Sequence, residues 1–176
     1  NYQNTGDKSD IKKSFALFLD SIEKNEISLI EVAEDLTCFT DTPVEINNNL
    51  IIPLAWIQEK ALKIANKPES KLDGAVLFYL SKLLSFHSGS QGWYNTSLKI
   101  LKDYPIPDDS ANDIQCAYCL IRGLRLEKIE NKEVDPYIFD ECKKASYRLM
   151  MRLEPDGSPT QILGMNKRKN FRETDL

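Results

Sequence analysis

The most hydrophobic stretch of the chain reads LDGAVLFYLSKLLSFH over residues 72–87. If this stretch is helical, its apolar side chains fall on nearly every side of the helix rather than along one stripe. A helix that is apolar all round must be covered by other helices to be stable in water. The stretch therefore predicts a central helix, and with it an all-α fold in which the rest of the chain packs around residues 72–87.

The surrounding sequence repeats the helical period and is broken by short polar or proline-containing loops. Asp10 and Ser28 are suited to cap two early helices, and Asp135 with Pro136 is a favourable start for the last one. The expected helices cover about residues 10–24, 28–39, 53–66, 72–87, 93–104, 108–129 and 135–153. We expect a single-domain irregular bundle of about seven antiparallel helices, because short loops make consecutive helices antiparallel. Helix pairs spaced by roughly 35–45 residues leave a helical-hairpin, repeat-like stack as the alternative.

Length and composition predict one domain. The chain has 176 residues, of which 41% are hydrophobic and 28% charged, as is typical of soluble globular proteins. We expect residues 1–154 to form the helical domain and residues 155–176 to form a loosely packed basic C-terminal extension. No apolar run approaches the roughly 18 residues that a membrane span needs, so we expect no membrane association.

Four cysteines lie in apolar, helix-like segments, where a free thiol acts as a small hydrophobic group: Cys38, Cys116, Cys119 and Cys142. The pair Cys116 and Cys119 has the CxxC spacing of zinc and redox sites. It lies inside a helical pattern, and no second closely spaced pair completes a zinc site. The sequence therefore predicts two core-facing cysteines, no metal, and a reduced cytoplasmic protein; an exported protein whose leader has been removed is the alternative.

No motif indicates catalysis. His87 is the only histidine, and its position at the end of a helical pattern favours a role at a helix C-terminus over acid–base chemistry. The loop 89–92 contains two glycines, but it lacks the preceding strand and the third glycine of a dinucleotide fingerprint. We therefore expect a protein that is not an enzyme and needs no cofactor, with a site assembled from scattered residues as the remaining enzymatic possibility.

The most unusual feature is a run of acidic residues around residues 29–39, which read LIEVAEDLTCF. On a helix, the apolar positions of this segment share one face and its carboxylates another. Residues 20–45 contain only one base, Lys24, so their charge is about −7 while the whole chain carries −4. The acidic residues are Asp20, Glu23, Glu26, Glu31, Glu34, Asp35, Asp41 and Glu45.

Carboxylates three and four residues apart on a helix repel one another, and a partner rich in lysine and arginine would offset this repulsion. The sequence therefore predicts that these eight residues bind a basic protein. In size, acidity and helical pattern the chain is similar to the immunity proteins that block bacterial toxins, and a basic nuclease-type toxin domain is the expected partner. We expect no direct contact with nucleic acid, because the chain as a whole is acidic. The sequence leaves the oligomeric state open.

The alternative function is that of a helical scaffold or adaptor. Such a protein would bind peptides in a groove between helices, with aromatic side chains as anchors. Trp56, Trp93 and Tyr94 are the candidates, although aromatic residues at helical spacing are also typical of a core.

Overall fold

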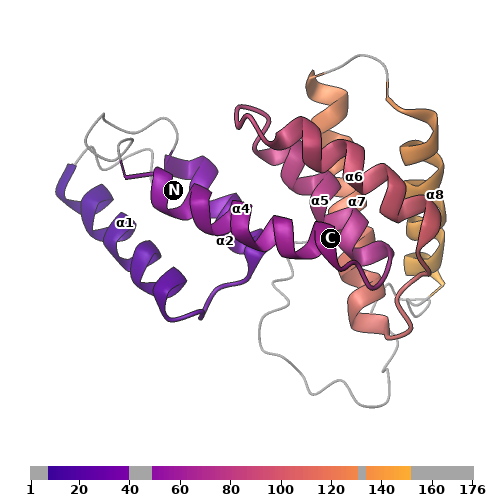
Figure 1. Ribbon diagram of the computed structural model, residues 1–176, viewed down its shortest axis with the longest axis horizontal. Coiled ribbons are helices and arrows are strands. Elements are labelled where there is room, and N and C mark those ends of the chain that lie inside the picture. Colours follow the sequence, from indigo (N-terminus) through magenta and orange to yellow (C-terminus); the bar gives the residue numbers. More distant parts are fainter. Residues whose placement is uncertain (1–7, 40–48, 131–133, 152–176) are drawn as a thin grey trace.

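The computed structural model describes residues 8–39, 49–130 and 134–151, which form seven helices and no strand (Figure 1). The helices are α1 (Lys8–Glu23), α2 (Leu29–Phe39), α4 (Ile51–Asn66), α5 (Lys71–Leu83), α6 (Ser90–Asp103), α7 (Ser110–Glu130) and α8 (Pro136–Met150). The prediction of an all-α fold is confirmed. Within these ranges, no helix is both long and apolar enough to cross a bilayer. Residues 155–176, predicted as an extension, lie outside the described part.

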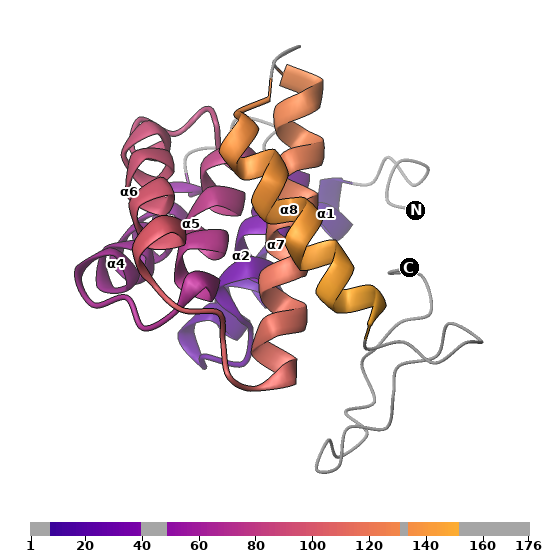
Figure 2. The same ribbon diagram turned by 90° about the vertical axis from the view of Figure 1, so that its right-hand side faces the viewer.

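Helix α5 is the centre of the fold, as its sequence predicts. Every residue from Gly74 to Ser81 is buried. Helix α5 packs against both α6 and α7, and α8 in turn lies across α7 (Figure 2). Since α5 also contacts α2 and α4, it is surrounded by elements from both halves of the chain. In a linear repeat each unit contacts only its neighbours. When the helices are grouped as the hairpins α2–α4, α5–α6 and α7–α8, their main contacts lie within one hairpin or with the next one, so the packing also fits the repeat-like stack.

Two glycines allow the helices around α5 to approach closely. A Cβ atom added at Gly123 of α7 would lie 2.6 Å from Cε1 of Phe78. A Cβ atom added at Gly74 of α5 would lie 2.9 Å from Cγ of Leu101 on α6. Because carbon atoms do not approach this closely without displacement, a side chain at either position would push the helices apart.

Three ion pairs with buried carboxylates connect helices α5, α7 and α8. They join α5 to α8, α5 to α7, and α7 to α8 through Lys71–Glu141 (2.6 Å), Lys82–Glu127 (3.0 Å) and Arg148–Asp113 (3.0 Å). The three carboxylate side chains are only 5%, 5% and 3% exposed. Because a charge buried without its partner is costly, these pairs strongly favour one register of the helices over others.

The first helices extend the core away from this half. Phe39 of α2 packs against Phe15 and Phe18 of α1, with ring centroids 5.0 Å and 5.4 Å apart. Helix α2 then contacts α4 and α5, so it joins α1 to the rest of the molecule. Figure 1 shows α1 at one end and α8 at the other. Buried side chains from all seven described helices form one hydrophobic cluster, which confirms a single-domain bundle.

Several expected helix ends differ from the structure. Helix α4 begins at Ile51 rather than at Pro53, and α6 begins at Ser90 rather than at Trp93, so residues 90–92 of the predicted loop 89–92 are helical. Helix α1 already begins at Lys8, so Asp10 lies in its first turn instead of preceding it as a cap. Helix α5 ends at Leu83, before the predicted end at His87. The prediction is too long because the apolar run continues past the end of the helix. Leu84 is fully buried although it lies beyond α5, so the run indicates burial in the core and not the length of the helix.

Candidate functional site

Glu23 and Glu26, two of the predicted acidic residues, lie at the turn between α1 and α2, and this turn has a defined geometry. Asn25 has a left-handed backbone, with φ of 53°. Its N–H donates to the carbonyl of Ile22 (3.1 Å), and the N–H of Glu26 donates to the carbonyl of Ser21 (3.0 Å). These are the two hydrogen bonds of a Schellman motif, in which asparagine is well tolerated at the left-handed position. The turn therefore holds Glu23 and Glu26 on an ordered backbone.

Helix α2 begins with a reciprocal cap. The N–H of Glu31 donates to Oγ of Ser28 (3.3 Å), and the N–H of Ser28 donates to Oε2 of Glu31 (2.9 Å). The predicted cap at Ser28 is thus confirmed, and Glu31 completes a capping box. The side chain of Glu31 remains exposed, so its carboxylate caps the helix and faces solvent at the same time.

Glu34 is used inside the fold. Its Oε1 accepts hydrogen bonds from the hydroxyls of Tyr79 on α5 (2.6 Å) and Tyr118 on α7 (2.8 Å). The side chain is half-buried, and the two tyrosine rings meet edge to face with centroids 6.1 Å apart. Burial, with the Glu34 carboxylate adding to it, raises the pKa of Tyr79, so the phenol remains a donor. Glu34 therefore joins α2 to α5 and α7.

Asp35 lies beside Glu34 in sequence but faces solvent. Partial desolvation raises the pKa of its carboxyl group, and the negative charges of Glu31 and Glu34 raise it further. The repulsion that the sequence predicts on this face of α2 is thus present in the folded protein.

The other predicted residues differ in their surroundings. Asp20 is exposed and forms an ion pair with Lys24 at 2.6 Å. Glu23 and Glu26 are exposed as well. Asp41 and Glu45 lie outside the described residues. Four exposed carboxylates therefore remain, which we call the acidic surface: Glu23, Glu26, Glu31 and Asp35. Among residues 8–39, 49–130 and 134–151, no lysine or arginine forms an ion pair with any of the four.

The CxxC cysteines lie in the core, as the sequence predicts. Cys116 and Cys119 are fully buried, and burial raises the pKa of Cys116 to about 12. Burial likewise raises the pKa of Cys142 to about 12, and its Sγ donates to the carbonyl of Leu120 (3.2 Å). These thiols stay protonated at neutral pH, which suits packing better than nucleophilic chemistry. Cys38 is the exception: it is exposed, so its expected role as a small hydrophobic group is wrong.

His87 does not lie at a helix C-terminus, because α5 ends earlier. It lies in the turn before α6, where its ring stacks on Trp93 with centroids 5.2 Å apart. Its Nδ1 accepts a hydrogen bond from the N–H of Gly89 (3.0 Å). Both contacts stabilise the connection between α5 and α6. Trp93 is itself buried, so this side chain is not an exposed anchor.

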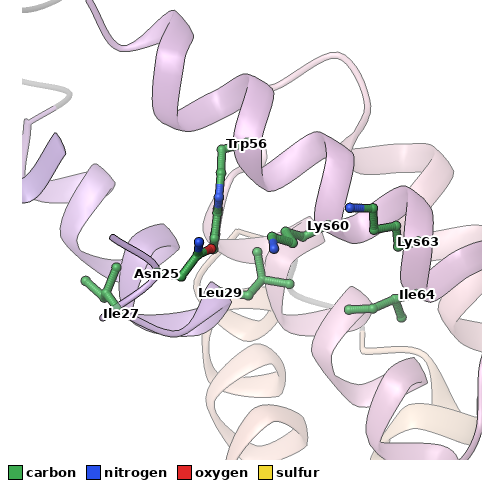
Figure 3. Close-up of a pocket in the computed structure, with 7 residues that line it drawn as sticks. All are labelled: Asn25, Ile27, Leu29, Trp56, Lys60, Lys63 and Ile64. Carbon is green, nitrogen blue, oxygen red and sulfur yellow. The ribbon is translucent and has the colours of Figure 1, made fainter. Parts of the chain in front are cut away.

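Tyr94 is half-buried as well. It lies beneath Lys82, whose Nζ is 4.3 Å from the ring centroid. Burial raises the pKa of Tyr94 to about 12. Trp56, the third aromatic residue that the sequence suggests as an anchor, lines a pocket, which Figure 3 shows between α4 and the α1–α2 turn. We call this depression of about 370 Å³ the α4 pocket.

No protein-family model, curated protein or solved structure matches this chain. In the described part of the chain, no group of three or more histidine, cysteine, aspartate or glutamate side chains is placed to hold a metal ion. The acidic surface and the α4 pocket are two surfaces in the described part of the chain that can contact another molecule.

Proposed function

We propose that this protein is a non-enzymatic inhibitor that binds a basic protein partner through the acidic surface. The supporting observation is the state of Asp35, whose ionised form is disfavoured by partial desolvation and by two neighbouring carboxylates. A lysine or arginine from a partner would relieve that repulsion. Binding would then use an interaction that the free protein lacks.

The acidic surface is also well ordered before any partner arrives. The Schellman turn positions Glu23 and Glu26, and the capping box positions Glu31. The bonds from Glu34 to α5 and α7 hold the helix that carries Asp35. A preordered surface loses little conformational entropy on binding, which favours tight association.

The partner class follows from the charge. A protein that cleaves nucleic acid needs a basic site for phosphates, and fixed carboxylates can occupy such a site in their place. Complementary charge also accelerates association, which an inhibitor needs when it must act before its target does. We therefore propose an immunity protein that neutralises a nuclease-type toxin of bacterial origin. We place it in the cytoplasm, where its four free cysteines would remain reduced.

Charge reversal on the acidic surface tests this proposal. The tagged chain is used as bait at low and at high ionic strength, and a captured basic protein is assayed for nuclease activity with and without the chain. We expect the chain to inhibit that activity, and both Glu31→Lys and Asp35→Lys to weaken binding at least roughly tenfold. Asp103→Lys is the matched control, because Asp103 is an exposed acid on the distant helix α6.

The proposal is refuted if the two reversed variants inhibit as well as the parent protein. It is also refuted if the captured partner is acidic, or if its binding does not respond to salt. Thermal unfolding of each variant must show that the helices remain folded.

A further inference from the structure

We propose that the α4 pocket is a second binding site, which takes a short peptide segment carrying an apolar side chain next to a carboxylate. This site is independent of the proposed inhibition and has the opposite charge preference. Its walls come from α4 and from the α1–α2 turn, so the Schellman turn that orders Glu23 and Glu26 also shapes the pocket.

Four of the seven residues that line the pocket are aliphatic or aromatic. Ile27 and Leu29 contribute from the turn and the start of α2, and Trp56 and Ile64 from α4. Figure 3 shows the Trp56 ring beside the side-chain amide of Asn25. A half-buried tryptophan with aliphatic neighbours is the type of surface at which apolar anchor residues of partners bind.

The rim of the pocket is basic. Lys60 and Lys63 both line it, and their amino groups point in the same direction, toward the α1–α2 turn (Figure 3). Lys60 Nζ lies 5.0 Å from the centre of the Trp56 ring system. Lys63 pairs with Glu59 at 2.5 Å, but both side chains are more than 60% exposed, and such pairs contribute little stability. None of the lining residues is acidic, so an incoming carboxylate meets the ammonium group of Lys60 and that of Lys63, which it would share with the exposed carboxylate of Glu59.

The pocket and the part of the acidic surface on α2 lie on different sides of that helix, whereas Glu26 lies in the turn between the lining residues Asn25 and Ile27. Leu29 lines the pocket, and Glu31 follows two residues later, which is about 200° around a helix. A basic partner bound at Glu31 and Asp35 would therefore face away from the pocket, and Lys60 and Lys63 would repel that partner from the pocket itself. The occupant that fits the pocket is an acidic, apolar peptide.

The pocket can be tested with random twelve-residue peptides displayed on phage and selected against the full chain. We expect the selected peptides to share an apolar residue adjacent to aspartate or glutamate. A synthetic copy of the best peptide is then titrated into a Trp93→Phe variant, in which Trp56 is the sole tryptophan. Its fluorescence should change on binding, because a bound side chain would cover the Trp56 ring.

Substitutions separate charge from shape. Lys60→Met keeps the aliphatic stem and should weaken the peptide at least roughly fivefold, and Trp56→Ala at least roughly tenfold. Lys99→Met, on an exposed site of α6, is the matched control and should change nothing. The proposal is overturned if the selected peptides are basic, if none is selected, if Trp56 emission does not respond, or if Lys60→Met binds as the parent does. Asp35→Lys, which leaves the cap of α2 intact, should not change peptide binding, and this distinguishes the site from the inhibitory one.

Discussion

Glu34 and Asp35 are adjacent acids on the same helix, and the structure predicts opposite effects when each loses its charge. Glu34 accepts two phenol hydrogen bonds through one oxygen, at 2.6 and 2.8 Å. A hydrogen bond to a charged group contributes roughly 1.5–3 kcal/mol, and one between neutral groups roughly 0.5–1.5 kcal/mol. Glu34→Gln keeps an acceptor but removes the charge, so about 1–1.5 kcal/mol is lost per bond. We expect the free energy of unfolding to fall by roughly 2–3 kcal/mol, which lowers Tm by roughly 4–12 °C in a chain of this size.

Asp35→Asn should act in the other direction. It removes the repulsion from Glu31 four residues earlier, which is worth roughly 0.2–0.5 kcal/mol on a helix surface, and it removes the desolvated charge. Because folding raises the pKa of Asp35 above its ordinary value of 3.8, ionisation of this group destabilises the folded state. The gain from Asp35→Asn is therefore fully present at neutral pH. It disappears as the pH falls through the raised pKa toward 3.8 and both states become protonated.

Both variants can be compared by urea and thermal denaturation followed by circular dichroism, at pH 7 and near pH 4. A Tyr118→Phe variant, alone and combined with Glu34→Gln, isolates the longer of the two bonds as a coupling energy. The reasoning is refuted if Glu34→Gln is as stable as the parent, or if Asp35→Asn destabilises the protein at pH 7 by a similar amount. Either result would mean that Glu34 is a surface charge like its neighbour.

Three further predictions concern the fold. Gly123→Ala should cost about 1–2 kcal/mol, because the overlap with Phe78 outweighs the better helix propensity of alanine. In Gly92→Ala the added Cβ meets no atom within 4 Å, so the free energy of unfolding should instead rise by about 0.5–1 kcal/mol. Equal effects of the two substitutions in denaturant titrations would contradict the close approach of α5 and α7. Asn25→Gly should be tolerated, whereas Asn25→Val should lower the free energy of unfolding by roughly 1–2 kcal/mol, since valine disfavours a left-handed backbone. Equal denaturation midpoints for the two variants would argue against the Schellman turn. A thiol reagent at pH 8 should modify Cys38 rapidly in the native protein and all four cysteines only after unfolding; fast labelling of more than one thiol would show that the others are not buried.

Much of the fold was predictable because its signals are local. The period of apolar residues places each described helix, and short polar side chains mark several of their starts. Ser28 caps α2 as predicted, and Asp135 accepts the N–H of Tyr137 (2.8 Å) at the start of α8. The apolar period predicts helix ends less well where a residue is buried without being helical. Leu84 is such a residue, because it is buried beyond the end of α5.

The candidate site was predictable only in part. A helical period places Glu31, Glu34 and Asp35 on one side of α2, but it cannot show which of them meets another helix. The partners of Glu34 lie 45 and 84 residues away in the chain, at Tyr79 and Tyr118. No local pattern relates those positions. A tyrosine on an otherwise apolar helix, as in α5, is the signal that a buried acceptor is needed, although it does not say which one.

The amino-acid sequence by itself determined the helices, the central place of α5 and the excess of negative charge near the α1–α2 turn, because hydrophobic period, caps and charge are properties of neighbouring residues. Only the tertiary structure decided that Glu34 bonds internally while Glu23, Glu26, Glu31 and Asp35 face solvent, and that Trp56 and Lys60 border a pocket. The physical reason is that the exposure of a charge depends on contacts between segments distant in the chain, which form when the helices pack.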